Sequence, residues 1–413
     1  VQHFNHAVYR RNEALLKSLP EAARIADLCS LIGNHDDLQL LRLAYEYLPI
    51  TFGRRHGDPS RPWNEFAIRV KDDHGERLLS YQGNWRDIFQ NWEALLFSYP
   101  EFAESVIAKF VNASTMDGYN PYRITKEGID WEVEDPDDPW SYIGYWGDHQ
   151  IIYLQKLLEL SNHFHPGRLG AFLRQPIFSY ANVPYRIAAF EDQLTTPKNT
   201  VAFDQALAEQ IDERVQAMGA DGKLVFCTRN GGVCQVNLLE KLLVPLLCKL
   251  GNLVVDGGIW LNTQRPEWND ANNAIVGHGL SVVTTYYLRR YVRFLQDLLA
   301  DETAPFAISA EVSQWFADTA HALRQVRPLL GDQPISEAHR FETLVALGEA
   351  ASRYRQTVYQ QEGFSGTVDL PAEQVTALLA DALAAIDQTI ATNRRSDGLF
   401  HSYNLLELSP DGG

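Results

Sequence analysis

The stretch EWNDANNAIVGHGLSVVTTYYLRRY, residues 267–291, joins a polar loop to a long apolar run. Glu267 and Asp270 stand three residues apart around Trp268, and the apolar run that begins at Leu280 has the period of an amphipathic helix. The loop therefore brings its acids close to a helix N-terminus, where backbone N–H groups favour a negative charge. The alternative is an Asx-rich capping loop, because Asn and Asp side chains commonly bond their own backbone.

Helical periodicity continues outward from this stretch in both directions. We expect helices at 8–19, 21–32, 36–48, 84–98, 100–113, 148–162, 201–218, 235–250, 280–300, 309–328, 336–362 and 371–393. Strand signals are few and short, at 66–72, 223–227 and 253–261. Short links between helices imply antiparallel pairs, and no consensus repeat is visible, which favours a closed toroid over a solenoid. The sequence therefore predicts a mainly α fold, with residues 1–413 forming one domain.

The charge of the chain limits its partners. It carries 53 acidic against 36 basic residues, a net charge of -17, which repels nucleic acids and anionic membranes. No apolar run reaches the roughly 18 residues of a membrane span, and the first residues do not read as a signal peptide. We therefore expect a cytoplasmic protein that binds neither nucleic acid nor membrane. The chain begins inside a helix-like stretch without Met, so we also expect a piece of a longer polypeptide.

The four cysteines are irregularly spaced, which is typical of reduced, mostly buried thiols in a cytoplasmic protein. Cys227 and Cys234 are near enough in sequence to approach each other across a turn. A metal site or a disulfide at that pair is the alternative interpretation. The twelve histidines form no HExxH motif, and we expect no bound metal.

Aromatic and acidic residues alternate in DWEVEDPDDPWSYIGYWGDHQ, residues 130–150. Trp131 and Trp146 offer flat faces that stack on sugar rings, and carboxylates such as Asp148 accept hydrogen bonds from hydroxyl groups. The stretch therefore favours a carbohydrate groove, with ordinary loop packing as the alternative.

A second polar stretch, NWRDIFQNWEALL, spans residues 84–96. Arg86 and Asp87 stand side by side at the start of its predicted helix, where they form a donor and acceptor pair for sugar hydroxyls. The alternative is a first-turn Asp that favours the helix dipole, next to a surface Arg.

Taken together, these stretches resemble the cellobiose phosphorylase-like enzymes of the six-hairpin glycosidase superfamily. Residues 267–291 look like that family's DWNDGxN…VG…G.S region, and NWRDIFQNWEALL looks like its GFRDQLQD helix start. The resemblance covers roughly residues 75–300 and implies an (α/α)6 toroid that cleaves a glycosidic bond with inversion. It also implies that Asp270 is the general acid, with the remaining matched residues binding the sugar (Arg86, Asp87, Asp148 and Trp268).

The sequence also departs from that family's pattern. Glu267 replaces the motif's first Asp, and Ala271 replaces a Gly or Cys. The family's phosphate-binding residues lie past the catalytic loop, where FHSYN at 400–404 is the candidate.

Three functions therefore remain open at the sequence level. The first is a phosphorylase that acts on a β-linked gluco-oligosaccharide, with inorganic phosphate as co-substrate and no other cofactor. The second is an inverting hydrolase, whose base would stand about 6.5–9.5 Å from the acid. That base could be Glu132, Glu134, Asp148 or a residue past the end of this sequence. The third is a sugar-binding toroid without activity. A homo-oligomer is compatible with each of them.

Overall fold

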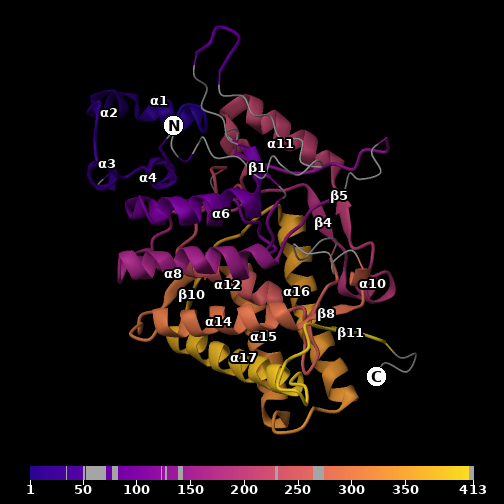
Figure 1. The fold of residues 1–413 in the computed structure, drawn as a ribbon. Coiled ribbons are helices and arrows are strands. Elements are labelled where there is room, and N and C mark those ends of the chain that lie inside the picture. Colours follow the sequence, from indigo (N-terminus) through magenta and orange to yellow (C-terminus); the bar gives the residue numbers. More distant parts are fainter. Residues whose placement is uncertain are drawn as a thin grey trace.

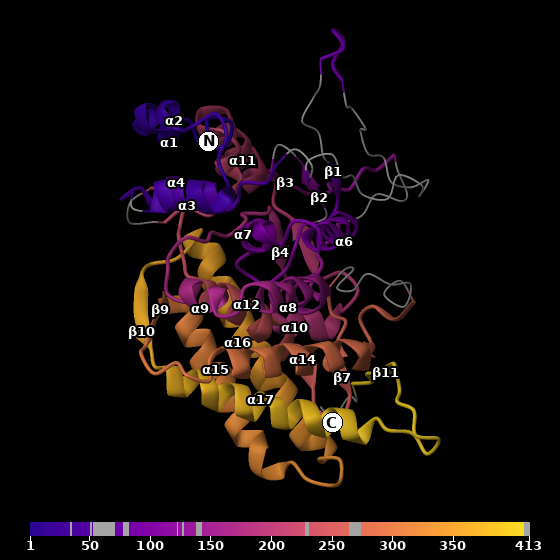
Figure 2. The ribbon, with the colours of Figure 1, turned by 60° about the vertical axis from the view of Figure 1, so that its left-hand side comes forward.

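A computed structural model describes residues 1–33, 35–49, 52, 71–76, 82–121, 123–125, 128–137, 143–227, 231–263 and 274–408, except for the side chains of 82–87. The described residues are mainly helical, as the periodicity predicted. The helices stack in successive layers from the N-terminal segment at one end to α17 at the other (Figures 1 and 2). Closure of these layers into an (α/α)6 ring stays a prediction.

Helix α12 (Leu238–Leu250) lies in the middle of this stack, and every one of its residues is buried. Its sequence, LLEKLLVPLLCKL, is apolar around the whole circumference apart from Glu240, Lys241 and Lys249. A helix of this kind is expected in the interior, where it packs on several neighbours. Asn237 caps it by accepting a hydrogen bond from the backbone N–H of Glu240.

Four long helices form the C-terminal half, close to the ranges predicted. They are α14 (Val282–Leu298), α15 (Ala310–Val326), α16 (Glu337–Gln361) and α17 (Ala372–Thr392), with the short η4 (Arg327–Leu329) after α15. The antiparallel strands β9 (Phe306–Ser309) and β10 (Thr367–Leu370) lie just before α15 and α17. By length and composition alone α17 could cross a membrane, but it packs on α14 and α15 as a core helix does.

The middle of the chain supplies shorter helices. They are α6 (Trp85–Leu96), η1 (Pro100–Phe102), α7 (Ala103–Asn112), the π-helical turn η2 (Gln150–Leu154), α8 (Gln155–Phe164), α9 (Arg168–Phe172), α10 (Phe190–Thr195), α11 (Gln205–Met218) and η3 (Ala220–Lys223). Pro100 opens η1, as expected for a residue that lacks a backbone N–H.

Strands are more numerous than the sequence indicated, and each is short. One sheet has the order β1 (Gln82–Asn84), β2 (Arg123–Thr125), β3 (Gly128–Asp130), and β4 (Tyr185–Ile187) pairs with β5 (Val201–Phe203). A third sheet has the order β11 (Tyr403–Leu405), β8 (Gly279–Ser281), β7 (Gly258–Trp260), β6 (Leu253–Val254). The helices predicted from 201 and 280 therefore begin after a strand, because pairing with a distant segment outweighs local helix propensity.

The N-terminal segment 1–49 holds α1 (His6–Arg11), α2 (Glu13–Ser18), α3 (Ile25–Gly33) and α4 (Leu38–Tyr45). The single helix predicted over 8–19 is interrupted at Asn12, whose side-chain amide donates to the Val8 carbonyl and to Asp37. The helix predicted over 21–32 begins at Ile25 instead.

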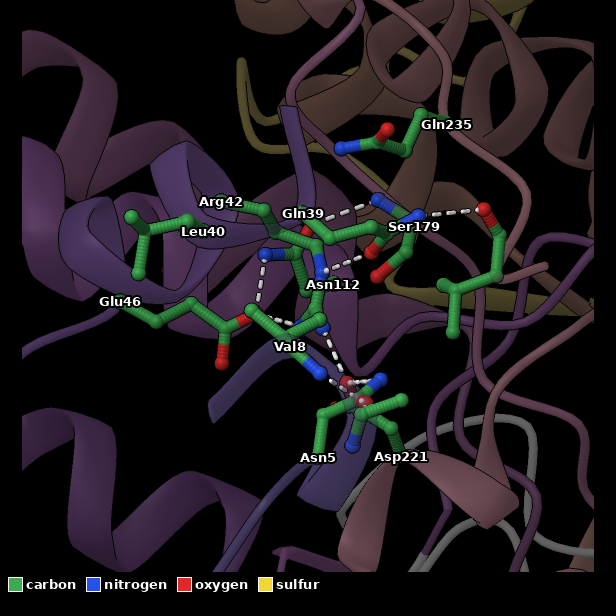
Figure 3. Close-up of polar contacts among 12 residues, drawn as sticks. Asn5, Val8, Gln39, Leu40, Arg42, Glu46, Asn112, Ser179, Asp221 and Gln235 are labelled. Atoms are coloured by element: carbon green, nitrogen blue, oxygen red, sulfur yellow. Dashed lines mark hydrogen bonds and ion pairs between the residues drawn. The ribbon is translucent and has the colours of Figure 1, made fainter. Parts of the chain in front are cut away.

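A buried ionic network fastens this segment to the rest of the molecule (Figure 3). Arg42 of α4 donates to Asp221 of η3 at 2.5 Å and to Glu46 at 2.9 Å. Asn5 also donates to Asp221, at 2.9 Å. Glu46 in turn accepts from Lys109 and Asn112 of α7, at 3.2 and 2.6 Å. We call these six side chains the docking network.

Candidate functional site

Two of the residues singled out from the sequence, Trp146 and Asp148, lie together in a buried polar region at the start of η2. The Trp146 ring stacks on His149, with centroids 5.7 Å apart and planes 18° apart. A carboxylate oxygen of Asp148 lies 3.9 Å from His149 Nε2. The exposed fractions of Trp146, Asp148 and His149 are 4%, 5% and 0%, so the whole group is enclosed.

Asn120 lies directly beside Trp146. Their backbones pair in both directions, with the Asn120 N–H donating to the Trp146 carbonyl at 2.8 Å and the reverse bond at 3.1 Å. The Asn120 side chain is fully buried, and neither its Nδ2 nor its Oδ1 has a hydrogen-bond partner in the part of the chain that the structure describes. Buried amides normally have partners, so an amide with both atoms unpaired indicates a place for a ligand or water.

Lys249 of α12 approaches Gly147, next to Trp146, from the interior of the molecule. A Cβ on Gly147 would lie 2.7 Å from Lys249 Nζ and 3.2 Å from a ring carbon of Tyr119, so a glycine at 147 is what lets Lys249 approach. Lys249 is 2% exposed. Among the described residues no hydrogen bond or ion pair of its ammonium group is found, so this charge remains for another group to bind.

A chain of amides continues the region towards β7. The Asn252 amide donates to Tyr119 OH at 3.5 Å, and Asn262 Nδ2 donates to Asn252 Oδ1 at 2.9 Å. Burial raises the pKa of Tyr119 well above its usual value, so this phenol stays protonated. Asn262 and the adjacent Thr263 are 2% and 1% exposed. We call the set Asn120, Trp146, Asp148, His149, Lys249, Asn252 and Asn262, together with Tyr119, the polar cluster.

Asp117 holds the backbone segment that carries Trp146 and Asp148 of this cluster. Its carboxylate accepts hydrogen bonds from Thr115 at 2.5 Å, from Tyr359 of α16 at 2.5 Å, and from Tyr145. Tyr145 immediately precedes Trp146, and its ring stacks on Tyr119 at 4.8 Å. Three donors to one buried carboxylate therefore hold the segment that carries Trp146 and Asp148 in a fixed place.

The other residues predicted from the sequence are placed as follows. Arg86 and Asp87 lie in the first turn of α6, and their side chains are outside the described residues. One turn later Gln90 donates to Tyr153 OH at 3.5 Å, and the Tyr153 ring packs on His149 at 5.4 Å. The start of α6 therefore faces η2 and the cluster.

Trp131 has a different environment, because the Nζ atom of Lys223 from η3 lies 5.3 Å from its ring centroid. Glu267, Trp268 and Asp270 lie outside the described residues. The last described residue before their segment, Thr263, lies near the Tyr119 hydroxyl at the edge of the polar cluster.

Sequence reasoning did not single out Asn120 or Lys249. The signal for Lys249 is a cation within the otherwise apolar LLEKLLVPLLCKL, where a charge needs a partner. The signal for Asn120 is the aromatic and polar stretch DGYNPYR. Neither signal says that the two residues belong to one region, since they are far apart in sequence.

Comparison with known proteins gives one finding at the N-terminus. Residues 1–49 match the family model described as "Glycoside hydrolase family 149 insertion domain 1". No curated protein matches the chain. The N-terminal segment is therefore similar to a domain that occurs in glycoside hydrolase family 149. This match agrees with the superfamily expected from the sequence but does not support the cellobiose phosphorylase family specifically.

The matched residues are those that the docking network holds. Arg42 and Glu46 lie inside the matched segment, and their partners Asp221, Lys109 and Asn112 lie outside it. The segment that resembles an insertion domain is therefore joined to the following chain by buried charged contacts.

Proposed function

We propose that this protein is a glycoside phosphorylase that cleaves a β-linked gluco-oligosaccharide with inversion. The match of residues 1–49 to a glycoside hydrolase family 149 domain supports a carbohydrate-active enzyme. The resemblance around Asp270 supports a catalytic acid in the segment that follows Thr263. Inorganic phosphate would be the second substrate, and no other cofactor is proposed.

The observation that carries this proposal is the presence of Asn120 beside Trp146 and of Lys249 beside Gly147 in the same polar cluster. An amide with an unpaired donor and an unpaired acceptor suits a sugar hydroxyl, which both donates and accepts. Asp148 adds an acceptor, and Trp146 adds a flat face. A buried ammonium group without a described partner suits an anionic substrate, and a hydrolase has no such substrate.

The proposed reaction needs a single carboxylic acid. Asp270 donates its proton to the glycosidic oxygen as the bond from that oxygen to the anomeric carbon breaks. A phosphate oxygen attacks the anomeric carbon from the opposite face, so the products are a sugar 1-phosphate of inverted configuration and a shortened sugar. Arg86, Asp87 and Asp148 hold hydroxyls of the transferred sugar, while Glu267, Trp268 and Trp131 line the substrate groove.

Inverting hydrolysis is the alternative, and it needs a second carboxylate to activate water. Among the three acids considered for this role, only Asp148 lies in the polar cluster, where it is 5% exposed, whereas Glu132 is half-buried and Glu134 is exposed on the surface. Asp148 is therefore the base that a hydrolytic mechanism would use.

Product analysis distinguishes these functions. The purified chain is incubated with β-linked gluco-oligosaccharides with and without inorganic phosphate, and both free sugar and sugar 1-phosphate are measured. Sugar 1-phosphate that forms only with phosphate is the expected result. Free sugar formed at the same rate without phosphate would establish a hydrolase, and binding without turnover would establish a non-catalytic sugar-binding protein.

A further inference from the structure

The hairpin that connects η3 to α12 carries two cysteines on one face. An isolated antiparallel bridge pairs Phe226 with Val233, the Cys227 N–H donates to the Gly232 carbonyl at 2.9 Å, and the Cys234 N–H donates to the Val225 carbonyl at 2.8 Å. Side chains alternate between the faces of paired strands. Cys227 and Cys234 therefore both lie on the face opposite Phe226 and Val233.

The two side chains are diagonal neighbours on this face of the hairpin. The neighbouring Cys227 side chain and burial raise the pKa of Cys234 far above its usual value, so Cys234 is held as a thiol. Cys227 is half-buried and adjoins the turn, whereas Cys234 is buried. Cys227 is thus the more exposed of the two residues.

The hairpin can adjust to a covalent link. Diagonal neighbours across two strands have Cα atoms about 7–8 Å apart, and disulfides bridge Cα atoms about 4.4–6.8 Å apart. Closure thus draws the two strands slightly together. Gly231, which has φ of 64°, and Gly232 lie in the connecting turn, where glycine permits such a change. A shared metal ion fits less well, because no group of three metal-binding side chains occurs among the described residues.

We propose that Cys227 and Cys234 form a reversible dithiol–disulfide pair that locks this hairpin beneath the N-terminal segment. The hairpin is one of the surfaces on which α4 rests. Gln39 Nε2 donates to the Val233 carbonyl at 2.7 Å, and Gln235 Nε2 donates to the Leu38 carbonyl at 2.8 Å. Oxidation of the pair therefore stiffens the support of residues 1–49.

The chemistry is a thiol–disulfide exchange with a low-molecular-weight disulfide such as oxidised glutathione. Cys227 loses its proton and attacks one sulfur of the glutathione disulfide, which forms a mixed disulfide and releases one glutathione thiolate. Cys234 then loses its proton and attacks the Cys227 sulfur, which releases the second thiolate. The protein loses two protons and two electrons, and oxidised glutathione is reduced to two thiols.

The test equilibrates the whole chain in glutathione buffers that run from fully reduced to fully oxidised. Free thiols are then blocked, counted under denaturing conditions, and mapped by mass spectrometry of peptides. The sequence has four cysteines, so the expected count falls from four to two, with one peptide joining Cys227 to Cys234. The oxidised form should also unfold at a higher temperature than the reduced form.

Single-cysteine variants test the two exchange steps separately. In Cys234→Ser the second step is absent, so glutathione should stay attached to Cys227. The matched control Cys29→Ser removes a half-buried cysteine elsewhere and should still lose two thiols on oxidation. Four free thiols throughout the wild-type series would overturn the proposal. So would a link that involves Cys29 or Cys248, or a persistent glutathione adduct on Cys227 of the wild type. The wild-type mapping decides the matter even where Cys234→Ser does not fold.

Discussion

The molecule buries two sets of polar side chains that differ in how completely they are paired. In the docking network every charged group has an opposite charge within reach, as Arg42 has in both Asp221 and Glu46. In the polar cluster Asn120 has both amide atoms unpaired, and Lys249 has no ion pair among the described residues. Burial alone therefore does not distinguish the two sets. The paired set joins two parts of the chain, and the incompletely paired set is the one that we propose binds the substrate.

The largest expected effect concerns Asp270, the proposed general acid. Asp270→Asn should lower turnover by about 10²–10⁴-fold, because the amide has the same shape but cannot donate the proton. Initial rates with phosphate give the measurement, and circular dichroism checks that the variant is folded. A variant that turns over at the wild-type rate would remove Asp270 from the mechanism.

Disruption of the docking network should lower the stability of the fold rather than the turnover rate. Arg42→Met leaves Asp221 and Glu46 without a buried cation between them and should reduce the free energy of unfolding by about 3–5 kcal/mol. Urea unfolding measures this change. The control Arg353→Met removes an exposed pair with Asp318, and its effect should be about 0–1 kcal/mol.

If Arg42→Met lowered sugar binding by the folded protein and left unfolding unchanged, the two polar sets would have exchanged roles. The comparison would then fail, because the paired set would be the one that binds a ligand.

The comparison can also be tested within helix α12, which carries both Lys249 and Lys241. Lys249→Met should raise the KM for phosphate by about 10–100-fold, because a hydrogen bond to a charged group contributes about 1.5–3 kcal/mol. The control is Lys241→Met on the same helix, since Lys241 Nζ donates to the Ser114 carbonyl at 3.3 Å and lies 3.2 Å from the Tyr180 ring centroid. Lys241→Met should change stability and leave the KM for phosphate unaltered. Equal phosphate KM values for both variants and the wild type would exclude Lys249 as an anion-binding group.

The smallest expected effect is on how much stability the protein loses at acid pH. Although burial opposes it, Lys109 and Arg42 hold the pKa of Glu46 below its usual value of 4.5. Glu46 therefore contributes stability above about pH 4.5, and this contribution is lost as the pH falls through the lowered pKa, by about 1.4 kcal/mol for each unit of the shift. Glu46→Gln should flatten the decrease in stability below pH 4.5. Unfolding midpoints of both proteins across this range give the test, and parallel curves would contradict it.

The sequence predicted most of the helices because their apolar periodicity is local. The four long C-terminal helices begin and end close to the predicted residues, and Pro100 marks the start of η1. The prediction was wrong at Asn12 and at the start of α3, where side-chain hydrogen bonds and the loop into α3 interrupt an apolar pattern. The short strands were mostly missed, since each depends on a partner far away in the chain.

For the candidate site, the sequence by itself determined the types of side chain. It placed Trp146, Asp148 and Asp270 in aromatic and acidic stretches that favour sugar chemistry, and the match to a glycoside hydrolase family 149 domain agrees with that class. Only the tertiary structure decided that Lys249 of a buried helix lies beside Gly147, and that Asp221 closes a network with Arg42. The physical reason is that periodicity records which face of an element is buried. Which charges meet depends instead on how distant elements pack, and no local pattern encodes it.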